Sequence, residues 1–377
     1  MAETRPLWAA IRSILADATT WSHEVPVPPS WIAGSALGMS IPIAAGTAIG
    51  RPDLGMLASI GGLAVSGVGG YGTLREQSVR LSYALIAGTL AILIGSAIGG
   101  HGWITGAAVV IATILAALIG GFGRTIARYS SVSIVFVVIG TGVNPAGAVS
   151  PVGITLVFIT GAIWTIVVSL LASGLFRVLG METIPDPGTF TGKQSAVPPF
   201  KNRLRRWSVS LSRSAGWHYP LRIGLCMVAA EIVAVLWGQP QSYWIALVVA
   251  IVVQRSFETT SSRVFQRAIG TFAGVLAVSV LLLWYLPIGM LVLVVMILAA
   301  LRPLLKGRNY ALYSAVMTPL VLILLEFGKP MTPDILAYRL IDTIIGLFIG
   351  IVLGYHIWPA KNSPSSPSKE KRFGIRE

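Results

Sequence analysis

The sequence predicts an all-α, polytopic integral membrane protein with about twelve transmembrane helices, arranged as two parallel repeats of six helices. The first observation is composition: of 377 residues, 54% are hydrophobic and 11% are charged, whereas soluble domains carry roughly 25% charged residues. A soluble protein with so few charges could not cover its surface, whereas the hydrocarbon core of a bilayer needs none. The other two observations are regularly spaced apolar segments and a similarity between the two halves of the chain.

Residues 1–30 come before the first apolar segment and contain a short amphipathic pattern. Leu7, Trp8, Ile11 and Leu15 fall on one face of a helix. Such a helix either lies in the membrane interface or is a soluble lead-in. We expect this region to be cytoplasmic or interfacial, because it does not have the pattern of a cleavable signal peptide.

Twelve apolar segments follow, six on each side of a basic linker, and a bilayer-spanning helix needs about 20 such residues. They are 31–50, 54–72, 81–99, 103–121, 131–147 and 152–176, then 221–237, 243–254, 268–286, 288–301, 310–327 and 336–358. The predicted regions are therefore a first repeat over 31–176, a linker over 177–216, a second repeat over 217–359 and a disordered basic tail over 360–377.

Basic residues alternate between the connections. The turns 73–80, 122–128 and 255–267 are rich in arginine, whereas the turns between them hold few basic residues. Basic residues are retained on the cytoplasmic side of a membrane, so we expect both termini and the linker to be cytoplasmic. The formal charge of +14 is then a matter of membrane topology. Nucleic-acid binding is not expected, because none of the usual binding modules is present.

The two halves of the chain look like a parallel duplication. Arg80 corresponds to Arg267 at an offset of 187 residues, and Gly88 corresponds to Gly274 at an offset of 186. Six helices per repeat is an even number, so both repeats would enter the membrane from the same side. A pseudo-two-fold axis along the membrane normal follows, with a transport path between the halves near the midplane.

Glycines recur at four-residue spacing inside the apolar segments. Gly346, Gly350 and Gly354 form one such series, and Gly270 with Gly274 forms another. Small residues at this spacing let helices pack closely in lipid. We expect a packing role, with pore lining or helix kinking as the alternative.

Charged residues inside apolar segments are costly and tend to be functional. Glu231 lies in the middle of a segment, nine residues after Arg222, with no cation within one helical turn. We interpret it as a proton-coupling site. Arg339 and Asp342 are three residues apart and share a helical face, so Asp342 is either half of an ion pair or a second coupling site. Arg222 and Arg339 are also candidate substrate contacts.

The turn after the segment 243–254 holds Arg263 and Arg267, which are four residues apart. Guanidinium groups bind carboxylates through paired hydrogen bonds, and Tyr243 and Trp244 offer rings on which an aromatic substrate can stack. We interpret these four residues as substrate or translocation contacts. The alternative is that the arginines only anchor the turn in the cytoplasm.

The stretch 243–274 resembles the fusaric acid resistance protein-like family, also called FUSC-like, which includes aromatic acid exporters. The residues that carry the resemblance are Tyr243, Trp244, Thr259, Thr260, Arg263, Arg267, Gly270, Thr271 and Gly274, with Arg339, Thr343, Gly346 and Pro359 further on. The resemblance implies a bacterial inner-membrane protein that exports aromatic carboxylates by means of the proton-motive force. It also implies distant kinship with plant aluminium-activated malate transporters, which are anion channels.

The sequence and the resemblance together predict a secondary transporter that exports small, aromatic organic anions across the bacterial inner membrane, coupled to protons. The alternatives are a passive organic-anion channel and a non-transporting envelope scaffold. No phosphate-binding loop or catalytic constellation indicates an enzyme, and no metal-ligand cluster or cofactor motif is present. The expected partners are membrane lipid and the anion, with a homo-oligomer compatible with the pattern.

Overall fold

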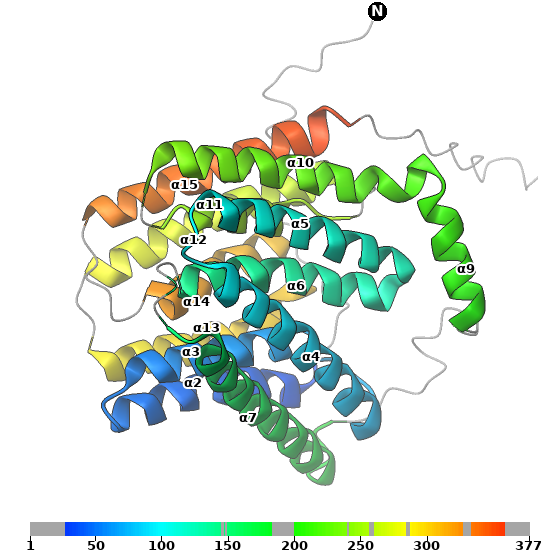
Figure 1. Cartoon of the computed structure of the whole chain (residues 1–377). Helices are drawn as coiled ribbons and strands as arrows, with labels where there is room; N and C mark the ends of the chain where they lie inside the picture. The colour runs from blue at the N-terminus through cyan, green and yellow to red at the C-terminus, as the bar shows by residue number, and fades with distance from the viewer. Residues whose placement is uncertain are drawn as a thin grey trace, which may run out of the picture.

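The structure is a computed structural model in which every described element is a helix, a turn or a short connection (Figure 1). It describes residues 27–144, 147, 149–182, 200–239, 241–255, 260–283, 287–326 and 333–358, with some helical residues, among them 260–265, described by their backbone only. The predicted amphipathic pattern before residue 27 and the predicted tail after residue 359 lie outside these ranges.

Each predicted apolar segment contains one helix. In the first half these are α2 (Pro29–Ala48), α3 (Pro52–Ser66), α4 (Leu74–Ile98), α5 (Trp103–Ile119), α6 (Arg124–Val143) and α7 (Pro151–Val178), with the 3-10 turn η1 (Gly120–Phe122) after α5. In the second half they are α10 (Ser214–Trp237), α11 (Tyr243–Val252), α12 (Thr260–Leu283), α13 (Ile288–Lys306), α14 (Tyr310–Glu326) and α15 (Pro333–Ile351), with a π-helical turn η2 (Val352–His356) at the end.

Eight of the described helices are long and apolar enough to cross a membrane. They are α2, α4, α5 with η1, α6, α7, α10, α13 and the α15 region. The chain is therefore a multi-pass helical membrane protein. The helix in the predicted segment 243–254 is too short to span a bilayer: α11 has ten residues and is about 15 Å long, half of the roughly 30 Å hydrocarbon core.

Local signals explain several helix ends. Thr73 accepts a hydrogen bond from the Glu76 N–H at 3.2 Å, and the Glu76 carboxylate accepts one from the Thr73 N–H at 2.9 Å. This capping box starts α4. Pro151 occupies the first turn of α7, where the missing N–H costs nothing. Gly238 ends α10 in the left-handed conformation, with φ +63, which glycine adopts without strain.

The glycine series pack helices together, as predicted. A Cβ on Gly270 would lie 2.2 Å from the Ala311 carbonyl oxygen, and one on Gly274 would lie 2.7 Å from the Ala315 carbonyl oxygen. The backbones of α12 and α14 therefore approach at distances that no larger residue allows.

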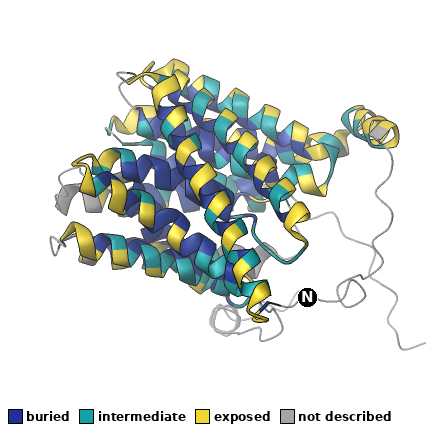
Figure 2. Cartoon of the chain, turned by 90° about the horizontal axis from the view of Figure 1, so that it is seen from below, coloured by how far each residue is buried: buried dark blue, intermediate teal, exposed yellow. Residues whose placement is uncertain are grey.

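The short helix α11 lies in the interior of the molecule. It contacts α6, α10, α12 and α15, and every residue from Trp244 to Val249 is buried. Gly346, Gly350 and Gly354 of α15 face it, because a Cβ on each would contact Val248, Val252 and Val253 respectively. Figure 2 shows the buried residues on the parts of the helices that face the interior of the molecule and the exposed ones around the outside.

The predicted linker contains one further helix, α9 (Phe200–Leu211), at one end of the molecule (Figure 1). Trp207 donates to the Leu118 carbonyl at 3.0 Å, and the Arg203 guanidinium lies over the Phe122 ring, 5.0 Å from its centroid. The helix α9 is therefore docked on η1 and the end of α5. We call this the basic end of the molecule, because α9 carries Lys201, Arg203, Arg205 and Arg206.

Two glycines of α7 make a matched test of close packing. A Cβ on Gly161 would lie 1.9 Å from the Ala58 carbonyl oxygen, whereas Gly174 has nothing within 4 Å. Gly161→Ala is expected to lower the free energy of unfolding by about 1–3 kcal/mol, as overpacking does. Gly174→Ala should be neutral or stabilise by up to about 1 kcal/mol. Denaturant unfolding in detergent measures both; equal effects would contradict the close contact of α7 with α3.

Candidate functional site

The carboxyl end of α11 is buried at Val252 and Val253, and polar side chains bind carbonyls at this end and just beyond it. Arg222 of α10 donates to the Gln254 carbonyl. The Tyr355 hydroxyl donates to the Val252 carbonyl at 3.0 Å and accepts from the Gln254 N–H at 3.0 Å. A helix carboxyl end carries partial negative charge and carbonyls without helical partners. A cation and a hydroxyl satisfy both requirements here.

Three arginines, Arg222, Arg255 and Arg267, surround this end, and we call them the arginine cluster. Arg222 is fully buried and lies 5.5 Å from the centroid of the Tyr219 ring, and Arg255 lies 5.4 Å from the same centroid. Arg267 donates to the Tyr310 hydroxyl. The described contacts of the cluster are thus aromatic rings, a hydroxyl and carbonyls.

Arg255 shows the electrostatic cost of this arrangement. Burial lowers the pKa of the Arg255 guanidinium from its ordinary value, and the neighbouring Tyr219 opposes the shift. A guanidinium remains charged in proteins despite such shifts. The cluster therefore brings positive charge next to the end of α11.

Arg339 of α15 lies at the amino end of α11. Its side chain is 2% exposed, and its guanidinium lies 4.9 Å from the centroid of a Trp244 ring and 5.3 Å from that of Tyr243. It also donates to the Gln241 carbonyl at 3.1 Å and to the Gln241 side-chain oxygen. Both ends of α11 are therefore held by buried arginines stacked on aromatic rings.

A close ion pair with Arg339, one of the two alternatives for Asp342, is not found among the described residues. Both residues are described, and the ion pair shown among described residues is the exposed Arg51–Asp53 at 2.9 Å. Arg339 extends toward Gln241 and the aromatic rings, and not toward Asp342, its neighbour on the helix. Asp342 is 1% exposed, and its Oδ1 has no hydrogen-bond partner in the described part of the chain.

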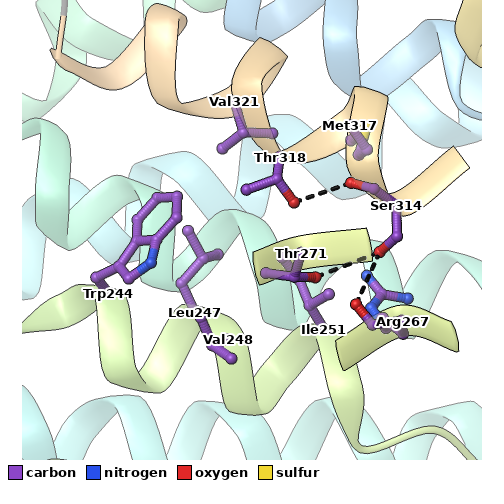
Figure 3. Close-up of a pocket in the computed structure, with 10 residues that line it drawn as sticks. All are labelled: Trp244, Leu247, Val248, Ile251, Arg267, Thr271, Ser314, Met317, Thr318 and Val321. Carbon is purple, nitrogen blue, oxygen red and sulfur yellow. Dashed lines mark hydrogen bonds between the residues drawn. The ribbon is translucent and has the colours of Figure 1, made fainter. Parts of the chain in front are cut away.

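A small pocket lies between α11, α12 and α14 (Figure 3). It is lined by Trp244, Leu247, Val248 and Ile251 of α11, Arg267 and Thr271 of α12, and Ser314, Met317, Thr318 and Val321 of α14. One wall is apolar. The facing helices bring hydroxyls, and the Ser314 and Thr271 hydroxyl oxygens are 3.3 Å apart.

The pocket joins the two arginine sites. Trp244, which Arg339 touches, lines it from the amino end of α11, and Arg267 of the arginine cluster lines it from the other helices. Its free volume is about 20 Å³, enough for about one water molecule. The pocket is closed to an organic anion in this conformation.

Glu231 lies apart from α11, where α10 packs on α5. A Cβ on Gly106 of α5 would come within 3.0 Å of the Glu231 Oε2, so the carboxylate occupies the space that the glycine leaves. No described cation forms an ion pair with it. The interface between α5 and α10 joins the two halves of the chain.

The structure brings most of the predicted substrate contacts together. Tyr243 and Trp244 belong to α11, and Arg222, Arg267 and Arg339 lie around it. Only the backbone of Arg263 is described, within α12.

Four further residues belong to the site: Tyr219, Gln254, Tyr310 and Tyr355. Three of them are tyrosines near a helix end that faces a basic turn. This position is the sequence signal that could have identified them.

Two basic residues of α13 hold the end of α3. Arg302 of α13 is 3% exposed and donates to the Ser66 hydroxyl at 2.7 Å, and Lys306 donates to the Gly67 carbonyl at 2.7 Å. The end of α3 is thus bound by cations, as the end of α11 is. Among the described residues, no group of three or more His, Cys, Asp or Glu side chains is placed to hold a metal ion.

Comparison with known proteins assigns the second half of the chain. Residues 226–353 match the sequence profile described as fusaric acid resistance protein-like, and these residues include α11, the pocket and Arg339. This is a fusaric acid resistance protein-like region. The family resemblance predicted from residues 243–274 is confirmed for it.

Proteins similar to this chain include membrane proteins of bacteria. "Inner membrane protein YccS" of Escherichia coli is 31% identical over 149 residues, or 39% of this chain and 20% of that one. "Uncharacterized membrane protein YvaC" of Bacillus subtilis is 31% identical over 144 residues, or 37% and 22%. "Uncharacterized protein YhfK" of Escherichia coli is 28% identical over 163 residues, or 43% and 22%. The aligned part of the chain spans about a fifth of each relative's length. No solved structure matches.

The contact between Trp244 and α15 is open to a direct test. The Trp244 indole N–H donates to the Thr343 hydroxyl at 3.0 Å, and both side chains are buried. Thr343→Val leaves the N–H without its acceptor, which is expected to lower the free energy of unfolding by about 1–3 kcal/mol. Thr160→Val is the control, because Thr160 is exposed and its hydroxyl bonds only within its own helix. Equal losses in denaturant unfolding would contradict the role of this bond.

Proposed function

We propose that the protein is a secondary transporter that exports small, aromatic organic anions. The observation that carries this proposal is the pair of arginine sites at the two ends of α11, joined by a pocket. Guanidinium groups remain charged in proteins, and carboxylates bind such groups with two parallel hydrogen bonds. The relative YccS is named an inner membrane protein, and this name supports the same location for this chain.

The chemistry of the pocket favours an aromatic anion. The apolar wall of α11 suits a ring, and Tyr243 and Trp244 at one end provide faces on which it can stack. The hydroxyls of Thr271 and Ser314 suit its polar substituents. Because the pocket holds about one water, transport on this proposal requires a motion that separates α11 from α12 and α14.

The helix contacts support the proposal of two six-helix repeats. Within the first half α2, α3 and α7 pack on one another, and α6 packs on α4 and α5; within the second half α10, α11 and α15 do the same, and α14 packs on α12 and α13. Between the halves, α13 packs on α2 and α5 packs on α10, while α14 packs on α3 and α6 packs on α11. Exchanging the halves leaves this pattern unchanged, as a pseudo-two-fold axis requires.

Glu231 and Asp342 are the proposed proton sites. Both are carboxylates in apolar helices, where a charge is costly and a proton removes the cost. Neither forms an ion pair with a described cation. On this proposal both termini and the basic end face the cytoplasm, so protons enter from the opposite side as the anion leaves.

Transport is measured as flux of labelled benzoate in proteoliposomes of the purified protein, with and without an imposed pH gradient. Uphill movement that a protonophore abolishes is expected. Arg267→Gln and Arg339→Gln should each raise KM at least tenfold, because each removes a guanidinium that meets the carboxylate. Arg213→Gln is the control, since Arg213 is exposed at the start of α10.

Two other outcomes of this flux measurement would replace the proposal. Downhill movement that follows voltage and ignores the pH gradient would make the protein a passive channel. If the protein unfolds cooperatively and moves none of the carboxylates tested, the remaining function is that of a non-transporting envelope scaffold.

Coupling is tested separately at Glu231. Glu231→Gln cannot take up a proton, so uphill transport should be lost while downhill exchange of benzoate continues. Gly106→Ala should weaken coupling as well, because its methyl group enters the space of the carboxylate. Asp342→Asn assigns the second carboxylate in the same assay. Unchanged uphill transport by Glu231→Gln would remove Glu231 from the mechanism.

A further inference from the structure

A groove open to the outside of the helix bundle runs between α4, α5 and α6. Its lining consists of Tyr83, Ile86, Ala87, Leu90, Ala91, Ile94 and Ile98 of α4, Ala108, Ile111, Ala112, Leu115, Ala116 and Ile119 of α5, and Ile126, Tyr129, Ser130, Ser133 and Val137 of α6. Its volume is about 690 Å³, within the roughly 300–1,000 Å³ typical of sites for small ligands. In Figure 1, α4 and α5 diverge from the turn that joins them, with α6 between them.

The lining requires an apolar occupant. Three of the polar side chains in it are engaged: the Tyr129 hydroxyl donates to the Arg80 carbonyl at 3.2 Å, the Ser133 hydroxyl donates to the Ala87 carbonyl at 3.4 Å, and Ser130 donates to the Ala116 carbonyl. Apart from these groups and the hydroxyl of Tyr83, the lining is hydrocarbon.

The length of the groove suits a lipid chain. From Tyr83 to Ile98 it follows α4 for about 22 Å. This exceeds the depth of one leaflet, about half of the 30 Å hydrocarbon core. An extended acyl chain fits this length and this chemistry.

Two arginines, Arg75 and Arg203, lie beyond the part of the groove that is nearest the basic end of the molecule. Arg75, Val79 and Tyr83 are four residues apart and follow one face of α4, and Arg75 is exposed. On the other wall, the half-buried Arg203 of α9 lies over Phe122 of η1, which follows directly after α5. The nearest acid in sequence, Glu76, already accepts from the N–H of its own helix cap.

We propose that this groove binds one anionic phospholipid, with an acyl chain between α4 and α5 and its phosphate at Arg75 and Arg203. A phosphate supplies the charge that both guanidinium groups lack in their described surroundings, and arginine binds phosphate through paired hydrogen bonds. A second copy of the chain suits the groove less well. Two-fold symmetry along the membrane normal would bring the basic ends of both copies to the same depth, with like charges facing each other.

The test titrates delipidated protein in a neutral detergent with dioleoyl phosphatidylglycerol or dioleoyl phosphatidylcholine, and native mass spectrometry counts the bound lipid. Phosphatidylglycerol is expected to bind at one per chain and at least tenfold more tightly. The double variant Arg75→Gln with Arg203→Gln should reduce that preference at least tenfold. Arg205→Gln with Arg206→Gln removes the same charge from exposed positions of α9 and should leave the preference unchanged.

The acyl chain is tested by filling the groove. Ala112→Trp should abolish binding of phosphatidylglycerol, whereas Leu156→Trp, at a site on α7 that is 58% exposed, should not. Equal affinity for the two lipids, or an unchanged preference in the Arg75/Arg203 variant, would overturn the proposal without any change in folding. If glycerol phosphate displaced the lipid at equal concentration, the site would bind the phosphate alone and the groove would not hold the acyl chain. A dimer that only Ala112→Trp dissociates would assign the groove to a second copy.

Discussion

The structure depends on satisfying helix ends that lie away from water. In a bilayer each unsatisfied backbone group costs several kcal/mol, and a helix leaves four carbonyls at its end without partners. α11 ends at buried residues, where Tyr355 binds the Val252 carbonyl and Arg222 binds the Gln254 carbonyl two residues further on; at the end of α3, Arg302 binds Ser66 and Lys306 binds Gly67. The contacts of Arg222 and Arg302 offset the cost of burying these two cations.

The same contacts explain how a fold this apolar retains positive charge near the proposed path. A guanidinium that binds carbonyls and stacks on rings is fixed in place before any anion arrives. Little reorganisation is then needed when the anion binds, which is the condition under which fixed charges are most effective. The glycine series of α15 contributes by letting α11 approach closely, so that Trp244 reaches Thr343 and Arg339.

The sequence predicted what local signals encode. Apolar segments located all the described membrane helices, and the spacing of Gly346, Gly350 and Gly354 predicted close packing. Sequence distance does not identify tertiary partners: Arg339 binds Gln241, nearly a hundred residues away in sequence. Tyr310 could not be assigned, since its contact with Arg267 exists only once α12 and α14 have packed.

The proposed proton and anion sites are separate, and α10 links them. Glu231 and Arg222 are nine residues apart on this helix, or about 13 Å, too far for direct contact. One faces α5 across the interface between the halves, and the other binds the end of α11. A proton on Glu231 removes a charge from that interface and lets α5 and α10 pack more closely. Because a helix moves as a rigid element, the displacement reaches Arg222 and the end of α11. Coupling on the proposed function is therefore a displacement of α10, with no need for the proton and the anion to meet.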